Sequence, residues 1–274
     1  MIKLVFLGSQ PTYVFIRRIT MVIVNPKNKS VEAFEGIHLY HGAISNCSMR
    51  VRMTLVEKGL EWTSHHIDLK KKENITDEYF GINPNGLVPT LIDNGVVHIE
   101  SNDIIDYLDQ RYPQPSLRDT ADESSMLEWL KLASALHVPA VKPYVYATMI
   151  QKKVKKTAEE EKKYDELQKN EELKDFHSKH SGNKVFGSAD VENSFKILEE
   201  SFEKLEATLT TKEWIMGSNF TLADISWIPL HFVLIGCGYP FAKYKNITRW
   251  ATQCESRESF KEGILKWCPD FSKV

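Results

Sequence analysis

Hydrophobic and polar positions follow one repeat in the first part of the chain and another in the second. Between Ile37 and about residue 115, short apolar runs of strand type alternate with segments of helical spacing. Asn94-Gly95 separates two of these runs, and this dipeptide is the strongest short signal for a hairpin. The expected strands are 37–40, 62–68 and two runs within 88–101, and the expected helices are 47–58, 76–83 and 101–112. This order predicts a small mixed sheet with helices on both faces.

Strand signals stop at the linker 113–119, and residues 122–265 have helical spacing. Pro139 and Pro143 are expected to bend or break the helical segment that contains them. A later helix opens at Thr221 and Asp224, which form a variant of the capping box. The expected helices include 122–138 and 191–209. The sequence therefore predicts an α/β domain over 37–115 and an all-helical domain over 122–274.

A highly charged insertion near residues 151–185 interrupts the helical half. Such a composition is typical of a solvated helix or a mobile insertion and less typical of a recognition site. The insertion could still reshape the mouth of a binding pocket or bind a partner.

Residues 1–36 contain short apolar runs that polar residues, Pro and Arg interrupt. A secretory signal needs one continuous apolar region, and a spanning helix needs about 20 apolar residues. Neither pattern is present in this segment. It is expected to be a flexible extension, a weak targeting segment or the product of an upstream start codon, and we place it outside the fold.

Composition excludes some classes of function. Lys and Arg number 35 against 37 for Asp and Glu, which gives a net charge of -2 and indicates neither nucleic acid nor a membrane as a partner. The four cysteines lack metal-like or secreted spacing, so we expect free thiols, a cytoplasmic location and no metal site.

Small polar residues gather where the first expected strand meets its helix, in the stretch "LYHGAISNCSMRVRMTLVEKG" from Leu39 to Gly59. The positive end of a helix dipole favours an anion, and a thiolate is one candidate. A free thiol has a pKa of about 8.5, so lowering it by about two units makes about three quarters of it ionised at pH 7. The stretch is thus a candidate thiolate site, although a simple helix cap explains it as well.

A second segment, "NPNGLVPTLIDNGVVHIESNDIIDYLDQRYP", carries two further signals. A cis bond at Val88-Pro89 would turn the Val88 amide and carbonyl outward, where they can pair with an extended peptide. Glu100 and Ser101 at a helix start could hold an amino-acid head group, with the ammonium on Glu100 and the carboxylate on the hydroxyl and amides.

Together with "GSNFTLADISW" in the helical half, these segments resemble the glutathione transferase family from Ile37 to about Ile264. The resemblance implies a thioredoxin-like domain that binds glutathione, and a helical domain that supplies the pocket for a hydrophobic electrophile. It also implies a homodimer and a role in detoxification. By the same resemblance, Ser45 stabilises the glutathione thiolate, Val88 and Pro89 pair with the cysteinyl backbone, and Glu100 and Ser101 hold the γ-glutamyl end.

The Ser45-x-Cys47 spacing is most similar to zeta-type transferases and tetrachlorohydroquinone dehalogenases. In those relatives the cysteine serves in isomerisation or in resolving a glutathione mixed disulfide, which makes Cys47 a second catalytic candidate here. A half-buried cysteine facing the sheet is the alternative, and the spacing of Cys47, Val51 and Leu55 favours it. Leu87 departs from the family pattern, because many relatives hold the glycine carboxylate with a polar residue there.

The main hypothesis is a transferase that conjugates, dehalogenates or cleaves ethers. The alternatives are a zeta-type glutathione-dependent isomerase and a non-enzymatic binding or regulatory protein. A thiol-disulfide oxidoreductase of the omega type is disfavoured, because it would carry cysteine at position 45.

Overall fold

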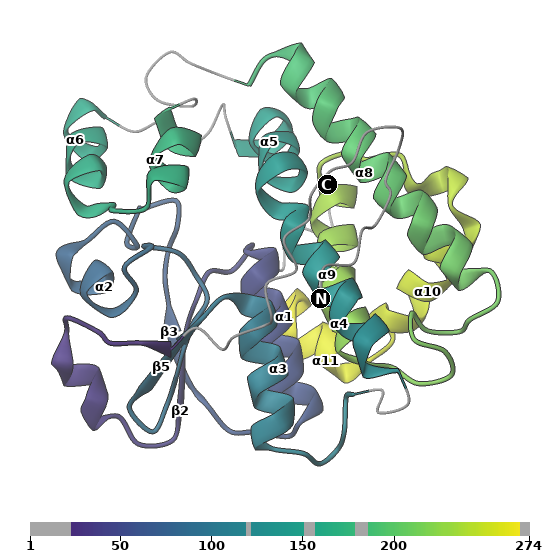
Figure 1. The fold of residues 1–274 in the computed structure, drawn as a ribbon, viewed down its shortest axis with the longest axis horizontal. Coiled ribbons are helices and arrows are strands. Elements are labelled where there is room, and N and C mark those ends of the chain that lie inside the picture. Colours follow the sequence, from purple (N-terminus) through teal and green to yellow (C-terminus); the bar gives the residue numbers. More distant parts are fainter. Residues whose placement is uncertain (1–22, 119–121, 151–156, 179–185, 269–274) are drawn as a thin grey trace, which may run out of the picture.

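The chain divides into a sheet domain and a helical domain that lie side by side in the computed structural model (Figure 1). The structure describes residues 23–118, 122–150, 157–178 and 186–268. Within these residues, no helix is both long enough and apolar enough to cross a membrane.

The sheet domain is built on five strands in the order β1-β5-β4-β2-β3. Only the β2–β3 pair is parallel, and the other neighbours are antiparallel. Asn94 and Gly95 have positive φ angles of 48° and 79°, as the tight turn between β4 and β5 requires. The strands are β1 Ile23–Val24, β2 Ile37–His41, β3 Thr63–His66, β4 Thr90–Asp93 and β5 Val96–Ile99. The predicted mixed sheet is confirmed.

Helices cover both faces of this sheet, as predicted. Strand residues such as Leu39 and Leu91 pack on one face against α1 and α3, while Ile92 and Val97 pack on the other face with Tyr79 of α2. These helices are α1 Asn46–Glu57, α2 Asp77–Ile82 and α3 Ser101–Arg111. All four residues of β4 are buried, and since successive side chains of a strand point to opposite faces, both faces of the sheet are covered there.

The expectation for residues 1–36 was wrong for the part that the structure describes. β1 pairs with β5 through Ile23 and Val24, and a 3-10 turn at Lys29–Ala33 buries Val31 beneath the α2 face. The segment belongs to the fold because it covers an otherwise open sheet edge. Residues 1–22 lie outside the described part.

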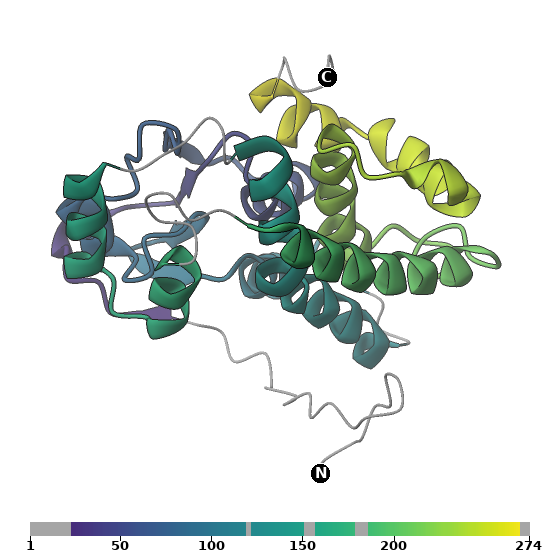
Figure 2. The same ribbon diagram turned by 90° about the horizontal axis from the view of Figure 1, so that it is seen from above.

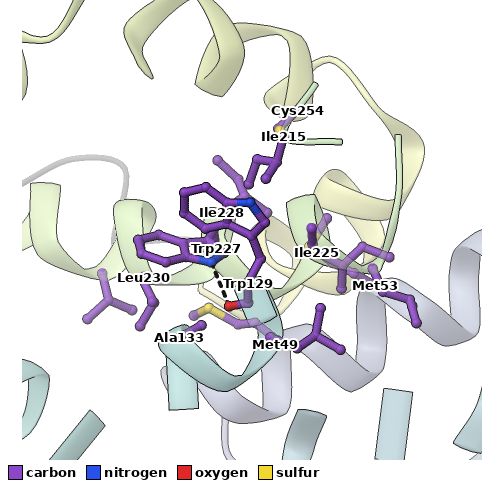
Figure 3. Packing of buried hydrophobic residues seen from close by; sticks show 14 of the residues in the cluster. Met49, Met53, Trp129, Ala133, Ile215, Ile225, Trp227, Ile228, Leu230 and Cys254 are labelled. Atoms are coloured by element: carbon purple, nitrogen blue, oxygen red, sulfur yellow. Dashed lines mark hydrogen bonds between the residues drawn. The ribbon is translucent and has the colours of Figure 1, made fainter. Parts of the chain in front are cut away.

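The helical domain forms one core with the first helix of the sheet domain. Met49 and Met53 of α1 lie beside Trp227 and Ile225, as Figure 3 shows. Trp227 is fully buried, and its indole Nε1 donates to the carbonyl oxygen of Trp129 over 3.1 Å. The helices are α4 Glu123–Ala135, α5 Lys142–Val145, α6 Ala158–Leu167, α7 Glu171–Ser178, α8 Ser188–Leu209, α9 Leu222–Gly236, α10 Lys245–Glu255 and α11 Glu258–Gly263. The helix that starts the predicted thiolate site is thus anchored in both domains.

Two sequence signals for helix boundaries have clear structural counterparts. Thr221 and Asp224 form the predicted capping box at the start of α9. Around Pro139 and Pro143 the helix continues from α4 through π-helical turns at His137–Val141 and Tyr146–Ile150. Proline therefore widens the helical turns here without ending the segment.

The described part of the charged insertion, residues 157–178, packs against the sheet domain, contrary to the expectation of a solvated or mobile segment. Tyr164 and Phe176 are buried, and the fully buried Gln168 donates from Nε2 to the carbonyl oxygen of Asn85 over 2.9 Å. Lys72 of the sheet domain pairs with Glu160. In both views α6 and α7 lie beside the sheet domain, away from α10 (Figure 2). A minority of apolar residues in a charged run is enough to fix it on a neighbouring surface.

Candidate active site

The turn between β2 and α1 places Ser45 at the N-cap of a 12-residue helix. The backbone amide of Ser48 donates to Ser45 Oγ over 3.2 Å, and the amide of Gly42 donates to Ser48 Oγ over 3.2 Å. Ser45 itself is half-buried. The predicted cap is therefore present, and the Ser45 hydroxyl still carries a proton that it can donate to an anion beside the helix start.

Cys47 lies one residue inside α1 and is half-buried. Its Sγ is 3.9 Å from Nη1 of Arg50 and 4.0 Å from Nε2 of His137. Arg50 is 1% exposed and takes part in no ion pair among the described residues, although its Nε donates to the carbonyl oxygen of Ser226 over 2.9 Å. A buried cation without a carboxylate makes this region favourable to an anion.

His137 and Lys142 reach the same region from the helical domain, and sequence reasoning missed both. Burial, with the charges of Lys142 and Arg50, lowers the pKa of His137 to about 3, so its imidazole is neutral. Burial also lowers the pKa of Lys142, while Cys47 and Glu100 oppose that change. His137 is 90 residues from Cys47 in the chain, and no local pattern marks it.

The Val88-Pro89 bond is cis, as predicted. Pro89 is buried, and Val88 lies against the β2–α1 turn, where a Cβ added to Gly42 would be 3.4 Å from its Cγ2. Neither the amide nor the carbonyl of Val88 takes part in a hydrogen bond within the described part of the chain. The Val88 backbone is therefore available to an extended ligand beside the turn that carries Ser45.

Glu100 and Ser101 stand at the start of α3, as predicted, but they face different surroundings. Glu100 is exposed and has a positive φ of 69°, which is uncommon for a residue with a side chain. Although the residue as a whole is exposed, protein atoms around its carboxyl displace water, and this with the nearby Cys47 raises the pKa of the carboxyl, against the lowering effect of His137 and Lys142. Ser101 is buried, and its Oγ accepts a hydrogen bond from Arg50 Nη1 over 3.1 Å. The Ser101 oxygen is thus held by Arg50, while its hydroxyl proton is not used by this bond.

The structure brings the predicted residues to one end of the sheet domain. Ser45 and Cys47 share the helix start, Val88 packs against the same turn, and Arg50 joins this helix to Ser101. A helix N-cap hydroxyl, the backbone of Val88 beside a cis-proline, unpaired within the described residues, and the carboxylate of Glu100 beside a helix start together suit a short peptide that carries a thiol. These features define a thioredoxin-like domain that binds such a peptide, followed by a helical domain.

Two descriptions of protein domains match this sequence. The glutathione S-transferase N-terminal domain matches residues 39–116, and the glutathione S-transferase C-terminal domain matches residues 132–258. The chain therefore belongs to the glutathione S-transferase family. Its activity is that of a glutathione transferase, with glutathione as the co-substrate.

Known relatives agree with the serine-type pattern. Protein LigF of Sphingobium sp. strain SYK-6 is 28% identical over 230 residues, which cover 80% of this chain and 89% of that protein. Glutathione S-transferase Z1 of Arabidopsis thaliana is 41% identical over 83 residues, 30% of this chain and 38% of the relative. The tetrachloro-p-hydroquinone reductive dehalogenase of Sphingobium chlorophenolicum is 22% identical over 234 residues, 82% of this chain and 94% of the relative.

The fold agrees with a solved structure as well. The crystal structure of beta-etherase LigF from Sphingobium sp. strain SYK-6 superposes with a TM-score of 0.72 at 24% identity, covering 87% of this chain and 99% of that one. The predicted combination of a thioredoxin-like domain and an all-helical domain is therefore confirmed.

Proposed function

We propose that this transferase ionises the thiol of glutathione at Ser45 and directs the thiolate to an electrophilic carbon of a hydrophobic small molecule. The observation that carries the proposal is the position of Ser45 at the N-cap of α1, with the buried Arg50 guanidinium in the same helix. The hydroxyl and the helix terminus both stabilise a negative sulfur.

The glutathione backbone is proposed to pair with Val88, whose amide and carbonyl are open to an extended ligand next to the cis-Pro89 turn. Its γ-glutamyl ammonium is proposed to bind the exposed carboxylate of Glu100. The γ-glutamyl carboxylate would bind the backbone amides at the start of α3 and the Ser101 hydroxyl, which accepts from Arg50 and still has its own proton to donate. Leu87 provides no polar side chain for the glycine carboxylate.

The reaction follows from this placement. The thiol proton leaves to solvent, the sulfur lone pair forms a bond to the electrophilic carbon, and a halide or an aryloxide departs with the electrons of the broken bond. Conjugation, dehalogenation and ether cleavage share this step. The names of two relatives, a beta-etherase and a reductive dehalogenase, support the last two as reactions to test.

A glutathione-dependent cis-trans isomerase of the zeta type is the second candidate. It is favoured by the position of Cys47 beside Arg50 and His137, and by the 41% identity to glutathione S-transferase Z1 over 83 residues. In this candidate, glutathione adds to a conjugated double bond and leaves again after rotation, so no group is lost.

We further propose a cytoplasmic homodimer with a role in detoxification. The free state of Cys47, Cys237, Cys254 and Cys268 supports a reducing compartment. Sedimentation equilibrium of the full chain tests the dimer, and a mass near that of one chain would contradict it.

The decisive experiment is the ultraviolet difference spectrum of bound glutathione between pH 5 and 9 for wild type, Ser45→Ala and Cys47→Ala. We expect the thiol of bound glutathione to titrate near pH 6 to 7 in wild type, and its pKa to rise by about one unit or more only in Ser45→Ala. Binding without any change of thiol ionisation would contradict activation at Ser45. Absence of glutathione binding would contradict the whole assignment.

A further inference from the structure

A second buried arginine lies behind the turn that carries Ser45. Arg52 follows Arg50 by two residues in α1, is 0% exposed and enters no ion pair among the residues that the structure describes. An isolated buried charge is costly, so its hydrogen bonds must compensate for the loss of water. The partners of those hydrogen bonds show which backbone segments Arg52 holds in place.

Arg52 binds the carbonyl oxygens on the N-terminal side of Ser45. Its Nη1 donates to Gly42 O over 2.9 Å, and its Nη2 donates to Ala43 O over 3.0 Å. Nη1 also lies 3.1 Å from Nδ1 of His41, which accepts because a guanidinium only donates. One guanidinium fork therefore holds two consecutive carbonyls of the β2–α1 turn.

The C-terminal end of the helical domain holds the other side of Arg52. Its Nε donates to Gly263 O over 2.6 Å, and the Trp267 ring lies 5.5 Å from the guanidinium carbon. Position 263 requires glycine, because a Cβ there would be 2.9 Å from the backbone nitrogen of Met53. The Cys268 thiol donates to Ala43 O over 3.1 Å, so the tail reaches the same turn directly.

We propose that Arg52 is a positioning residue for Ser45, which it keeps at the helix start by joining the Gly42 and Ala43 carbonyls to the C-terminal segment 263–268. The inference rests on the proposed function of Ser45. Arg52 does not touch glutathione in this scheme and acts through the turn and through its buried positive charge.

The charge state of the cluster supports this role. Burial lowers the pKa of Arg52 to about 10, against a raising effect of Cys268, so the guanidinium stays protonated at neutral pH. Burial and the neighbours Arg52, His66 and His65 lower the pKa of His41 to about 3, so its imidazole stays neutral. Burial raises the pKa of Cys268, which therefore remains a thiol that can donate.

The size of the effect can be bounded. Ala43 and Ser45 are two residues apart, so the guanidinium is on the order of 10 Å from the proposed thiolate. A unit charge at about 10 Å with an effective dielectric constant of about 20 lowers a thiol pKa by about one unit. The other charged groups near the thiolate, Arg50, Glu100 and Lys142, and the neutral imidazole of His137 are left in place by changes at Arg52.

The test is the pH titration of bound glutathione in Arg52→Gln and Arg52→Lys. We expect Arg52→Gln to raise the thiol pKa by about one unit. Arg52→Lys keeps the charge and loses the fork, so its thiol pKa should lie between those of Arg52→Gln and wild type. Arg257→Gln is the matched control, because Arg257 binds Glu57 at the other end of α1 over 2.7 Å and does not contact the turn.

The outcomes separate the two proposals. If the thiol of bound glutathione titrates near neutrality in wild type and has the same pKa in both Arg52 variants, Arg52 has no positioning role. The role proposed for Ser45 would still stand. If Arg52→Gln and Arg257→Gln raise the thiol pKa equally, the effect is a general loosening of α1, and the inference is overturned. If wild type shows no ionisation change, the function proposed for Ser45 fails first.

A second pair of variants covers the case in which the Arg52 variants do not fold. Trp267→Leu and Cys268→Ala loosen the same contact from the C-terminal side and leave the charge buried. We expect the double variant to raise the thiol pKa of bound glutathione by less than Arg52→Gln does. The acid ionisation constant should still decrease at least threefold. An unchanged pKa in this folded protein would overturn the inference as well.

Discussion

The guanidinium of Arg50 donates to the hydroxyl of Ser101 over 3.1 Å, and so joins the two helices that begin at the glutathione site. Nε of the same side chain donates to Ser226 O in α9. One buried side chain therefore connects α1, α3 and the helical domain. This connection makes the relative position of Ser45 and Glu100 depend on Arg50, which shares a side-chain hydrogen bond with neither of them among the described residues.

We expect Arg50→Met to lower the free energy of unfolding by about 2–5 kcal/mol, because the Ser226 carbonyl and the Ser101 hydroxyl lose their partner in a buried place. Urea unfolding followed by tryptophan fluorescence measures this change. Arg249→Met is the matched control, because Arg249 also binds carbonyl oxygens, including Leu209 O over 2.9 Å, but is exposed. Equal losses in the two variants would show that burial of Arg50 is not the cause.

Glutathione binding should weaken in acid through Glu100. The pKa of its carboxyl is raised, chiefly by loss of surrounding water, so the carboxylate that holds the γ-glutamyl ammonium is protonated earlier than an ordinary Glu as pH falls. We expect Glu100→Gln to reduce the affinity for glutathione about tenfold or more and to remove this pH dependence. Calorimetric titration between pH 4 and 7 measures both effects.

Glu192→Gln serves as the control for that experiment, because Glu192 is an exposed residue of α8 in the helical domain. Its affinity profile should match wild type. If the affinity of Glu100→Gln for glutathione still decreases in acid, with the same midpoint pH as wild type, the pH dependence belongs to another group.

The α6–α7 pair should detach when its buried amide is removed. Gln168 is fully buried and donates to Asn85 O over 2.9 Å, so Gln168→Ala leaves that carbonyl without its partner. We expect faster hydrogen exchange over 158–178 and 77–86, which corresponds to a loss of about 1–3 kcal/mol of local stability. Lys163→Gln, which breaks an exposed ion pair with Asp77, should leave exchange unchanged.

Asp224 should make the protein more stable toward mild acid. Burial raises the pKa of its carboxyl from 3.8 to about 6, although the amides of Ile215 and Thr221 and the indole of Trp250 donate to it. A carboxyl with a raised folded pKa binds protons more tightly in the folded state, so its contribution to stability falls as pH rises from about 4 to about 6. The shift corresponds to about 3 kcal/mol across that interval.

Denaturant unfolding of wild type and Asp224→Asn at several pH values between 4 and 7 tests this effect. We expect the variant to be less stable at every pH, because Asn cannot accept all of these bonds, and to lack the slope that Asp224 causes. Parallel curves for the two proteins would contradict the raised pKa.

The elements of the sheet domain could be predicted from the sequence because their signals are local. Asn94-Gly95 marks its hairpin, and the alternation of Leu39 and Tyr40 between faces marks β2. β1 could not be predicted in the same way, because Ile23 and Val24 form a strand only through pairing with β5. A strand of two residues has no pattern of its own.

The candidate site was predictable to the extent that its residues follow motifs in the sheet domain. The structure places Ser45 at a helix start and Val88 at a cis-Pro turn, as their motifs suggest. His137 approaches Cys47 only through the packing of α4 and its π-helical turn against α1, and distant contacts of this kind leave no local signal. The prediction of a solvated or mobile insertion was wrong for a related reason. Tyr164 and Gln168 become buried only when the other domain is present.

The packing of α6 and α7 against the sheet domain also determines whether the two domains can be exchanged separately between relatives. A chain segment that leaves the helical domain, covers α2 through Tyr164 and Phe80, and then returns to α8 makes each half incomplete without the other. A chimera that combines this sheet domain with the helical half of a relative that lacks such a segment would expose the covered surface. The two halves therefore complete one another in this structure, and a chimera between relatives should exchange residues 157–178 together with the surface beneath them.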